Sequence, residues 1–371
     1  MQDTAYRVLI LNSTYHVGGA ERILQQIALQ LRARFEIHFC ALYQPGRIGE
    51  QMAQQGLPVH ALYGTSRTDL RVFPRLLRLL RQIRPQVLLT VDSPHALAYA
   101  VLAKRLHRVP RLVIAVHSFG KLQRAREMAI ARRLASGVTD VVIALSETHR
   151  KFLIEQEEWK ARQVTVIPNG VDLNYFTPTG EHLRVEWGLA PDTPTYGLVA
   201  ALRPEKNHRR FLRVARRIEE VLPLARGFIV GDGALRAELE AEAKRLGIDR
   251  SVTFTSAVYN IPAVWHTLQV AVLTSDNVVE TLPMTLIEAA ACGVPAISTD
   301  VGAVRDIVLD GETGFVVPTD DEPLLAERIL YLLQHPAERH AMGQRARQHA
   351  ETHFDLQTMV QRYAQVLMPN P

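Results

Sequence analysis

The sequence predicts an α/β protein with two Rossmann-like, doubly wound domains that face each other across a cleft. Short apolar runs alternate with amphipathic segments along the chain, which is typical of parallel strands buried on both faces. This alternation breaks once, in the turn-rich stretch 175–180 and at Pro191 and Pro194. Polar and glycine-containing motifs follow the predicted strands, at the edge where such sheets bind ligands. With 371 residues, the chain is long enough for two domains of ordinary size.

The first domain is predicted to span residues 1–173, with helical patterns such as Glu21–Arg32 and Pro74–Arg84 between buried strands. Its strands are expected at Arg7–Asn12, Glu36–Leu42, Val59–Tyr63, Val87–Val91, Leu112–Val116, Val141–Leu145 and Val164–Ile167. The segment Asn169–Asp172 that follows is expected to form a structural turn at the hinge.

The second domain is predicted to span residues 190–354, after a boundary between Asp172 and Pro194. Its strands are expected at Tyr196–Ala201, Gly227–Val230, Val252–Thr255, Val270–Thr274, Ala296–Ser298 and Phe315–Val317. The stretch Pro336–Leu367 has a helical pattern with a break near His353.

Composition indicates a globular protein: 47% of the residues are hydrophobic and 22% are charged. No apolar run is long enough to span a bilayer, and the first residues do not resemble a signal peptide. We therefore expect a cytoplasmic protein. Cys40 and Cys292 lie in apolar stretches and are expected to be buried thiols, and no Cys/His cluster has zinc-site spacing.

Charge divides unevenly along the chain. Residues 1–180 carry 24 Lys and Arg against 13 Asp and Glu, whereas residues 181–371 carry 19 against 25. The basic half includes a leucine-rich helical pattern with Arg67, Arg71, Arg75 and Arg78. It fits either peripheral binding to an anionic inner membrane face or a solvated arginine face on a packed helix. The stretch lacks the aromatic residues of single-strand binders, so we expect no nucleic-acid partner.

Glu280 and Glu288 bracket the most informative segment. Glu280 ends a polar loop, whereas Glu288 lies in an apolar, alanine-rich run that is predicted to be a helix, with Pro283 suited to its first turn. The start of a helix offers free N–H groups and a positive dipole end to an anion. Such a segment suits a sugar nucleotide, which needs donors for its diphosphate and acceptors for its hydroxyls.

This segment resembles the E-x7-E motif of the retaining glycosyltransferases of family 4, which have the two-domain GT-B fold. Further motifs stand in the order and rough spacing of that family and extend the resemblance over nearly the whole chain. They are His16–Arg22, His117-Ser118, Val166–Asp172, Leu202–Asn207, Gly231-Asp232-Gly233 and Val301–Asp306. The resemblance also implies that the last helix, about 355–371, packs back on the first domain.

Arg203 and Lys206 are the expected cations for the leaving diphosphate, because they follow a predicted strand without a carboxylate cluster. The chain has no Asp-x-Asp sequence, so we expect neither a metal nor another cofactor. The resemblance implies that Glu280 contacts donor-sugar hydroxyls, that Glu288 contacts the ribose, and that the backbone from Thr281 to Met284 faces the sugar and phosphate. Leu282-Pro283 stands where many relatives have Phe-Gly.

The remaining expected site residues are single positions. Gly18 and Gly19 would let the backbone approach a ligand after the first strand, although a tight turn explains them equally. The resemblance places His117 beside the donor sugar, with a structural role as the alternative. Gly231 would allow the base or ribose to approach, and Tyr259 is expected near the base.

The predicted function is therefore retaining transfer of a hexose from a nucleotide-diphosphate donor to a hydroxyl of a lipid-linked or polysaccharide acceptor in cell-envelope synthesis. A UDP-sugar is the favoured donor and GDP-mannose the second. The alternatives are a non-catalytic sugar-nucleotide-binding module, a nucleotide-sugar epimerase or a glycan phosphorylase on the same fold. A dehydrogenase is disfavoured, because the Gly-x-Gly-x-x-Gly fingerprint is missing after the first strand.

Overall fold

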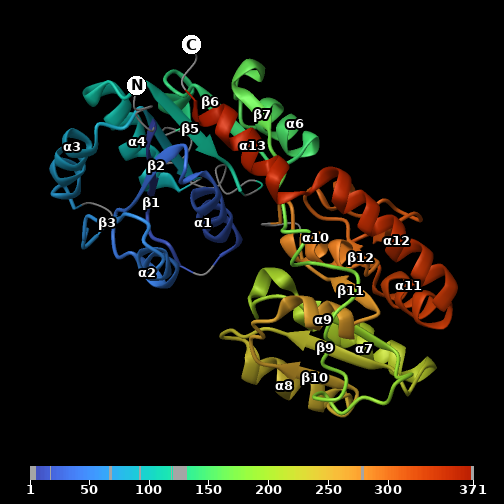
Figure 1. Ribbon diagram of the computed structural model, residues 1–371. Coiled ribbons are helices and arrows are strands. Elements are labelled where there is room, and N and C mark those ends of the chain that lie inside the picture. Colours follow the sequence, from blue (N-terminus) through green and yellow to red (C-terminus); the bar gives the residue numbers. More distant parts are fainter. Residues whose placement is uncertain are drawn as a thin grey trace. The chain divides into compact units, whose positions relative to one another are not determined.

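The computed structural model describes residues 6–16, 18–66, 69–91, 93–117, 119, 132–276 and 280–368. The chain divides into two compact units. The first unit comprises Met1–Asn169 and Gln357–Pro371, and the second comprises Gly170–Leu356. Figure 1 shows that each unit contains a sheet flanked by helices. Arg67, Ser118, one residue of the His16–Arg22 motif (Val17) and residues 369–371 of the expected last helix lie outside the described residues.

The sheet of the first unit is parallel throughout, with the order β3-β2-β1-β4-β5-β6-β7. Its strands are β1 (Tyr6–Asn12), β2 (Phe35–Ala41), β3 (Val59–Ala61), β4 (Val87–Val91), β5 (Arg111–Ala115), β6 (Val141–Ala144) and β7 (Val164–Val166). The direction of winding reverses between β1 and β4, which places the switch point of the sheet between these two strands.

The helices of the first unit each contribute buried apolar residues to the core of the protein. They are α1 (Gly19–Leu31), α2 (Gly46–Gln54), α3 (Val72–Ile83), α4 (Pro94–His107), α6 (Glu147–Glu155) and α13 (Leu356–Leu367), with the short 3-10 turn η1 (Ala161–Gln163). Except for its first residue, α13 belongs to the first unit, so the chain returns there after completing the second.

The sheet of the second unit is also parallel, with the order β10-β9-β8-β11-β12-β13. Its strands are β8 (Thr195–Val199), β9 (Arg226–Val230), β10 (Val252–Thr255), β11 (Val270–Leu273), β12 (Ala296–Thr299) and β13 (Gly314–Val317). Here the winding reverses between β8 and β11. The loops that leave these two strands therefore diverge at the position where open α/β sheets bind ligands.

The helices of the second unit follow the same alternation. They are α7 (His208–Val221), α8 (Arg236–Arg245), α9 (Ile261–Thr267), α10 (Met284–Ala291), α11 (Glu322–Gln334) and α12 (Pro336–His353), with the 3-10 turns η2 (Pro204–Lys206) and η3 (Val304–Asp306). No described helix of either unit is both long enough and apolar enough to cross a membrane.

The structure confirms every predicted strand, with ends that differ by no more than two residues. The predicted break near His353 is also confirmed, because α12 ends there and α13 begins at Leu356. Both cysteines are buried and free, and burial raises the pKa of each thiol to about 12.

The two passages of the chain between the units are hydrogen-bonded to each other. The N–H of Val171 donates to the carbonyl of Phe354 at 2.8 Å, and the N–H of Leu356 donates to the carbonyl of Val171 at 3.1 Å. A side chain at Gly170 would place its Cβ 2.7 Å from the carbonyl oxygen of Asp355. Glycine at this position is therefore explained by close backbone packing, which is a structural role.

Candidate functional site

Lys206 and Glu280 meet at the switch point of the second sheet. Lys206 is the last residue of η2, which follows β8, and Glu280 precedes α10 after the loop that leaves β11. The ammonium Nζ of Lys206 forms an ion pair with Oε1 of Glu280, and the two side chains are 24% and 10% exposed. Both residues were predicted from the sequence, Lys206 as a cation for the diphosphate and Glu280 as an acceptor for the sugar. Their ion pair was not predicted.

Glu280 is also held from its own loop. The hydroxyl Oγ of Ser275 donates to Oε1 of Glu280 at 2.7 Å. One carboxylate oxygen thus accepts from both an ammonium and a hydroxyl, in a partly buried position where charge-assisted hydrogen bonds are stronger than in water.

The main chain of Glu280 packs against a glycine in an unusual conformation. Gly302 has φ +56°, and a Cβ there would lie 2.3 Å from the carbonyl oxygen of Glu280. The next residue, Ala303, donates its N–H to the carbonyl of Thr281 at 2.8 Å. Only glycine fits both the left-handed backbone and the contact, so the segment containing Gly302 fixes the position of Glu280.

Arg203, the second expected cation, is placed differently. It precedes η2 with an extended backbone, and its side chain is exposed. Within the described residues, its guanidinium makes no ion pair or hydrogen bond. It therefore remains a cation at the same loop as Lys206, but the structure does not bring it into contact with Glu280.

His208 stands two residues after Lys206 and is almost fully buried at the start of α7. Burial, followed by the nearby charge of Lys206, lowers the pKa of His208 to about 4. The imidazole is therefore neutral at pH 7. The charge at this loop resides on Lys206 and Arg203.

The segment between the two glutamates has the expected form. Thr281, Leu282 and Pro283 are buried, and α10 begins at the next residue, Met284, with Pro283 at its N-cap position. Glu288 is half-buried within α10, one turn before Cys292. The first turn of α10 and both glutamates therefore belong to one continuous segment that starts at the switch point.

Gly231 and Gly233 have a packing role that sequence reasoning missed. A Cβ at Gly231, which has φ +148°, would lie 2.1 Å from the carbonyl oxygen of Ala200, and one at Gly233 would lie 2.6 Å from that of Leu202. The N–H of Leu202 also donates to the carbonyl of Asp232 at 3.0 Å. These glycines hold the loop that leads to Arg203 against the end of β9.

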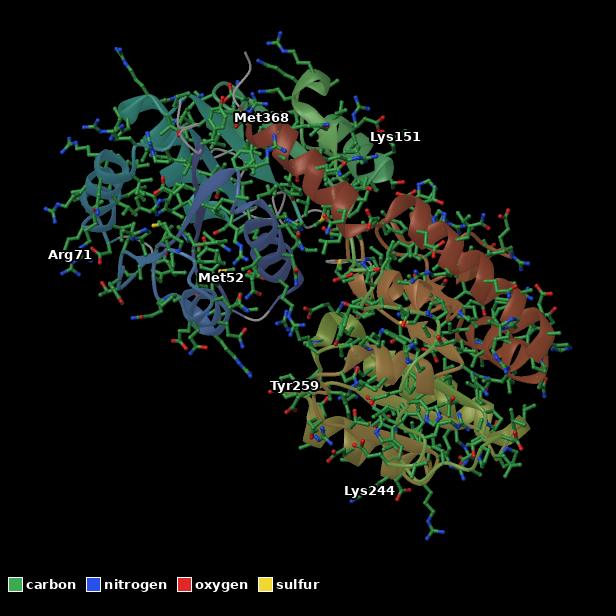
Figure 2. All side chains as sticks on the ribbon, in the orientation of Figure 1. Met52, Arg71, Lys151, Lys244, Tyr259 and Met368 are labelled. Atoms are coloured by element: carbon green, nitrogen blue, oxygen red, sulfur yellow. The ribbon has the colours of Figure 1, made fainter. Side chains whose placement is uncertain are left out.

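Tyr259 lies on the loop between β10 and α9, with 84% of its side chain exposed. Figure 2 shows it projecting from the second unit. No described contact joins it to Lys206 or Glu280, so its expected place near a nucleotide base stays a prediction.

Gly18 and Gly19 lie at the start of α1, after β1 of the first unit. Gly18 has an extended backbone, and the nearest atom to a Cβ there would be Oε2 of Glu21, at 2.3 Å. This neighbour is the end of a flexible side chain. Close packing within the protein therefore does not demand glycine here, unlike at Gly231 and Gly302.

His117 follows β5 of the first unit and is half-buried near His149. The Nδ1 atom of His149 accepts from the N–H of Leu145 at 3.2 Å. Burial, and then the neighbouring His117, lower the pKa of His149 to about 3, so that His149 is neutral. His117 thus stands beside a neutral buried ring at the carboxyl edge of the first sheet.

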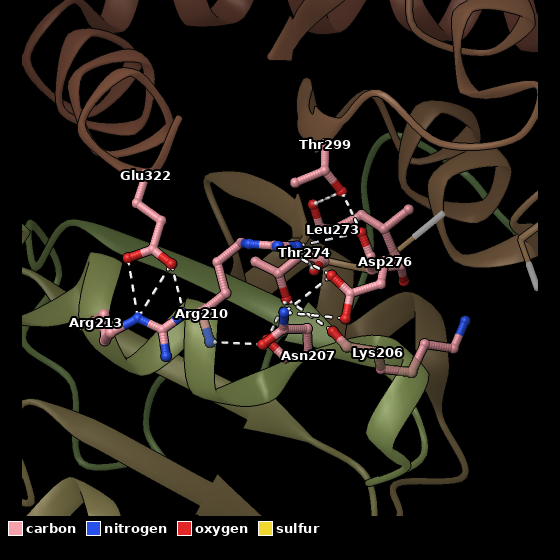
Figure 3. A network of polar contacts seen from close by, with 10 residues as sticks. Lys206, Asn207, Arg210, Arg213, Leu273, Thr274, Asp276, Thr299 and Glu322 are labelled. Carbon is pink, nitrogen blue, oxygen red and sulfur yellow. Dashed lines mark hydrogen bonds and ion pairs between the residues drawn. The ribbon is translucent and has the colours of Figure 1, made fainter. Parts of the chain in front are cut away.

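Sequence reasoning missed a polar network that surrounds the Lys206 loop. The amide of Asn207 and the guanidinium of Arg210 both bind the carboxylate of Asp276, as Figure 3 shows. A signal was present, because β8 and β11 are expected neighbours in a doubly wound sheet and polar residues follow both. The contacts themselves join residues 69 positions apart and cannot be inferred from spacing.

This arrangement can hold an anion and a polyol together. Lys206 and Arg203 supply positive charge, the first turn of α10 adds N–H groups and a positive dipole end, and Glu280 supplies a fixed acceptor. A phosphate needs the first two features, and the hydroxyls of a sugar need the third. The site therefore has the chemical groups for a phosphorylated sugar.

Two family models match the chain in consecutive segments. The model of glycosyltransferase family 4 matches residues 17–175, and the model of glycosyl transferases group 1 matches residues 181–349. The first match lies mostly in the first unit and the second match lies in the second unit.

Curated relatives share about a quarter of their residues with this chain. The GDP-mannose-dependent alpha-mannosyltransferase of Mycobacterium tuberculosis is 28% identical over 81% of this chain and 80% of its own length. The UDP-Gal:alpha-D-GlcNAc-diphosphoundecaprenol alpha-1,3-galactosyltransferase of Escherichia coli is 26% identical over 68% of this chain and 67% of its own length.

A solved structure with the same fold is HepE of Anabaena in complex with UDP. It superposes with a TM-score of 0.87, covers 97% of this chain and 99% of its own, and is 22% identical in sequence. The fold and both family matches agree with the resemblance found in the sequence motifs. The chain therefore belongs to the family 4-like glycosyltransferases, which have the GT-B fold of two Rossmann-like domains.

Proposed function

We propose that the protein transfers a hexose from a nucleotide-diphosphate donor to a hydroxyl of a lipid-linked or polysaccharide acceptor, with retention of anomeric configuration and without a metal. A UDP-sugar is the first candidate donor, and GDP-mannose is the second. The observation that carries the proposal is the contact between Lys206 and Glu280 at the switch point of the second sheet.

This contact suits transfer because the two halves of the donor make different demands. The diphosphate gains negative charge as the bond to the sugar breaks, and a cation in a partly buried site stabilises that charge most where it develops. The sugar must keep its orientation during this step, and a fixed carboxylate can accept hydrogen bonds from its hydroxyls. In this proposal Lys206, with Arg203, serves the diphosphate, and Glu280 serves the sugar.

The other expected donor contacts complete the proposal. Glu288 on α10 accepts from the ribose, and the backbone from Thr281 to Met284 faces the sugar and phosphate. Gly231 and Tyr259 serve the ribose and base. On the first unit, Gly18, Gly19 and His117 stay predicted contacts of the donor.

The names of similar proteins support a UDP-sugar as the first candidate donor and GDP-mannose as the second. HepE was solved with UDP, and the Escherichia coli relative is named for UDP-galactose and a diphosphoundecaprenol-linked acceptor. The Mycobacterium tuberculosis relative is named for GDP-mannose, which keeps that donor as the second candidate.

The arginine face of α3 supports a membrane-side acceptor. The apolar residues of this helix, including Val72, Leu76 and Leu80, are buried in the first unit. Arg75 and Arg78 are exposed on the outer face, and so is Arg71, which pairs with Asp69 at 2.8 Å. Figure 2 shows Arg71 at the surface. We propose that this face binds anionic lipid head groups by charge, since the leucines are already packed.

A donor screen tests the proposed reaction. The purified protein is incubated with UDP-, GDP-, ADP- and dTDP-sugars in the presence of EDTA, and nucleotide release and thermal stabilisation are recorded. We expect one UDP-sugar to stabilise the protein and to release UDP faster when an acceptor lipid is added. Thermal stabilisation without nucleotide release, whichever acceptor is added, would indicate a binding module. Conversion of the donor to an epimerised nucleotide sugar would indicate an epimerase.

The stereochemistry has its own readout. With an α-linked nucleotide hexose as the donor, NMR of the product distinguishes an α-glycoside, which means retention, from a β-glycoside. A β-glycoside would contradict the retaining mechanism but leave the donor assignment in place.

Membrane binding is measured by sedimentation with vesicles of phosphatidylcholine alone or with added phosphatidylglycerol. We expect binding to the anionic vesicles only, and we expect R75E/R78E to weaken it by about tenfold or more, since each basic residue near such a surface contributes about 1 kcal/mol. R245E in the second unit is a matched control, because it changes the charge of an exposed arginine on α8.

A further inference from the structure

Asn207 joins the Lys206 loop to α7 through both its backbone and its side chain. Its backbone is left-handed, with φ 47° and ψ 53°, a conformation that asparagine tolerates better than most residues. Its N–H donates to the carbonyl of Pro204 at 3.1 Å and closes η2. Its Oδ1 accepts from the N–H of Arg210 at 3.1 Å and caps α7. Lys206 is thus followed directly by a fixed residue.

The other half of the Asn207 amide reaches across to the loop that leaves β11. Its Nδ2 donates to Oδ1 and Oδ2 of Asp276 at 3.0 and 3.1 Å. The guanidinium of Arg210 pairs with the same carboxylate at 2.9 Å and donates to the carbonyl of Thr274 at 2.7 Å. Figure 3 shows Asn207 and Arg210 of one loop and helix converging on Asp276 of the other.

Backbone groups tie the same two loops together. The hydroxyl of Thr274 donates to the carbonyl of Lys206 at 3.0 Å, and the N–H of Asp276 donates to the carbonyl of Glu205 at 2.9 Å. Ser275, which donates to Glu280, has its carbonyl held by the hydroxyl of Thr299 at 2.8 Å. The loop carrying Lys206 and residues 274–276 after β11 therefore form one hydrogen-bonded body, from which Ser275 also holds Glu280.

Most polar atoms of this network are engaged within the protein, and the exception among its described side chains is Nε of Arg210, which is buried without a hydrogen-bond partner. The amide of Asn207 uses both its donor and its acceptor groups internally, and Arg210 is only 11% exposed. These residues are therefore poorly placed to bind a ligand themselves. The contacts of this network reach Glu205 and Asn207, which flank Lys206, and Ser275, which donates to Glu280. This placement suits residues that act through the Lys206–Glu280 pair.

We propose that Asn207 and Asp276 are positioning residues for sugar transfer. They fix the spacing between Lys206 and Glu280, so that a phosphate reaches the ammonium while the sugar reaches the carboxylate. This inference rests on the proposed function. A lysine side chain has four flexible carbons, so its ammonium stays in place only if its backbone and its partner are both fixed. Small displacements of a group that stabilises a transition state are costly in rate.

Two conservative variants test the positioning role. D276N keeps the shape of the side chain but removes the charge that faces the buried Arg210. N207G keeps access to the left-handed backbone but removes all three side-chain hydrogen bonds. We expect each to lower kcat by about tenfold to a hundredfold, because misplacement acts on the reacting geometry. We expect the donor KM to change by less than about threefold, since the groups that contact the donor are all retained.

The matched control lies on the same helix. Arg213 of α7 pairs with Glu322 of α11 and makes no hydrogen bond or ion pair to the described residues of either loop. E322Q removes this exposed ion pair from the same helix and should leave kcat and KM unchanged. Circular dichroism at the assay temperature shows that each variant is folded during the measurement.

A double-mutant cycle separates positioning from a general structural effect. If Asp276 acts through Lys206, then K206A/D276N is no slower than K206A alone, because the group being positioned has gone. If the two effects multiply, or if D276N keeps kcat within about twofold of wild type, the positioning role is contradicted.

The same measurements distinguish a failure of the positioning role from a failure of the proposed function. Wild-type turnover that K206A abolishes, together with fully active D276N and N207G, would retain the proposed function and reject the positioning role. A wild-type protein that neither binds nor turns over any nucleotide sugar would reject the proposed function, and the positioning role would fail with it.

Discussion

The two sheets have the same parallel, doubly wound topology, but the edges where their switch points lie have different chemistry. In the second unit, the loops after β8 and β11 carry a lysine–glutamate ion pair inside a dense polar network. In the first unit, the hydroxyls of Ser13 and Ser93, which follow β1 and β4, are hydrogen-bonded to each other, and His149 beside His117 is kept neutral. Among these described groups, those at the first edge are neutral, whereas those at the second edge carry charges.

Net charge would have suggested the reverse assignment. The half of the chain with the positive excess forms most of the first unit, whereas the half with the negative excess contains the cations suited to a diphosphate. In the first unit, three exposed arginines, Arg75, Arg78 and Arg81, lie on α3. The comparison teaches that a phosphate site depends on local geometry at a switch point, while net charge reports on the surface.

A substitution at Glu280 should have a large effect on activity. E280Q should lower kcat/KM by about a hundredfold, because it weakens the fixed acceptor for the sugar and leaves Lys206 without its ionic partner. Binding of UDP alone, measured by calorimetry, should persist, since UDP has no sugar beyond its diphosphate. E312Q, which changes an exposed glutamate of the same unit, is the control. Full activity of E280Q would show that transfer does not need the charged pair at the edge of the second sheet, and it would contradict the functional difference between the two edges.

Acidification should destabilise the second unit through His208. Its pKa of about 4 lies below the ordinary value of 6.5, so the unfolded chain takes up a proton that the folded unit excludes. The stabilisation is complete above pH 6.5 and is lost as the pH falls towards 4, up to ~3 kcal/mol by the difference in pKa. Urea unfolding between pH 4 and 7.5 measures it. H208Q should flatten this dependence, and an unchanged slope would contradict the neutral, buried assignment.

Gly302 should be far less replaceable than another left-handed glycine of the same unit. G302A should cost about 3 kcal/mol, because it adds a clash with the carbonyl of Glu280 to the backbone strain. G311A, where φ is +77° and no atom lies within 4 Å of the added Cβ, should cost only about 1 kcal/mol. Equal free energies of unfolding for the two variants would contradict the role of Gly302 in holding Glu280.

The smallest effect on stability is expected at Gly18 of the first unit. The added methyl of G18A would meet only the end of the Glu21 side chain, so the free energy of unfolding should change by less than about 0.5 kcal/mol. The KM for the donor should nevertheless rise, if the bare backbone at Gly18 approaches a ligand. A variant with unchanged KM would show that Gly18 serves only as a turn.

The positions of the strands could be predicted closely, because parallel strands that are buried on both faces appear in the sequence as short, uninterrupted apolar runs. β4 and β10 were predicted to the residue. The errors lie at strand ends, as at β3, where Leu62 and Tyr63 continue the apolar pattern but belong to the following loop. Local apolar patterning does not define where the pairing of strands stops.

The candidate site could be predicted only in part. Lys206 was found because it follows a predicted strand, and Glu280 because it begins the segment that resembles the E-x7-E motif. Their contact joins residues 74 positions apart. Asn207 was named as the end of the Leu202–Asn207 motif, and its bonds to Asp276 were not foreseen. Gly231 was assigned to ligand approach, which stays a prediction, and the structure adds a packing reason in the carbonyl of Ala200 that was not foreseen. Such contacts depend on how neighbouring loops lie together, which sequence periodicity does not encode.

The most direct test of the central claim is the rate of nucleotide release by K206A, measured with the donor that the wild-type protein accepts. The account predicts a fall in kcat/KM of about a hundredfold or more, because Lys206 stabilises the leaving diphosphate. K244A, which removes an exposed lysine from α8 of the same unit, should be fully active. A K206A variant within twofold of wild type would contradict the assignment of donor chemistry to this site.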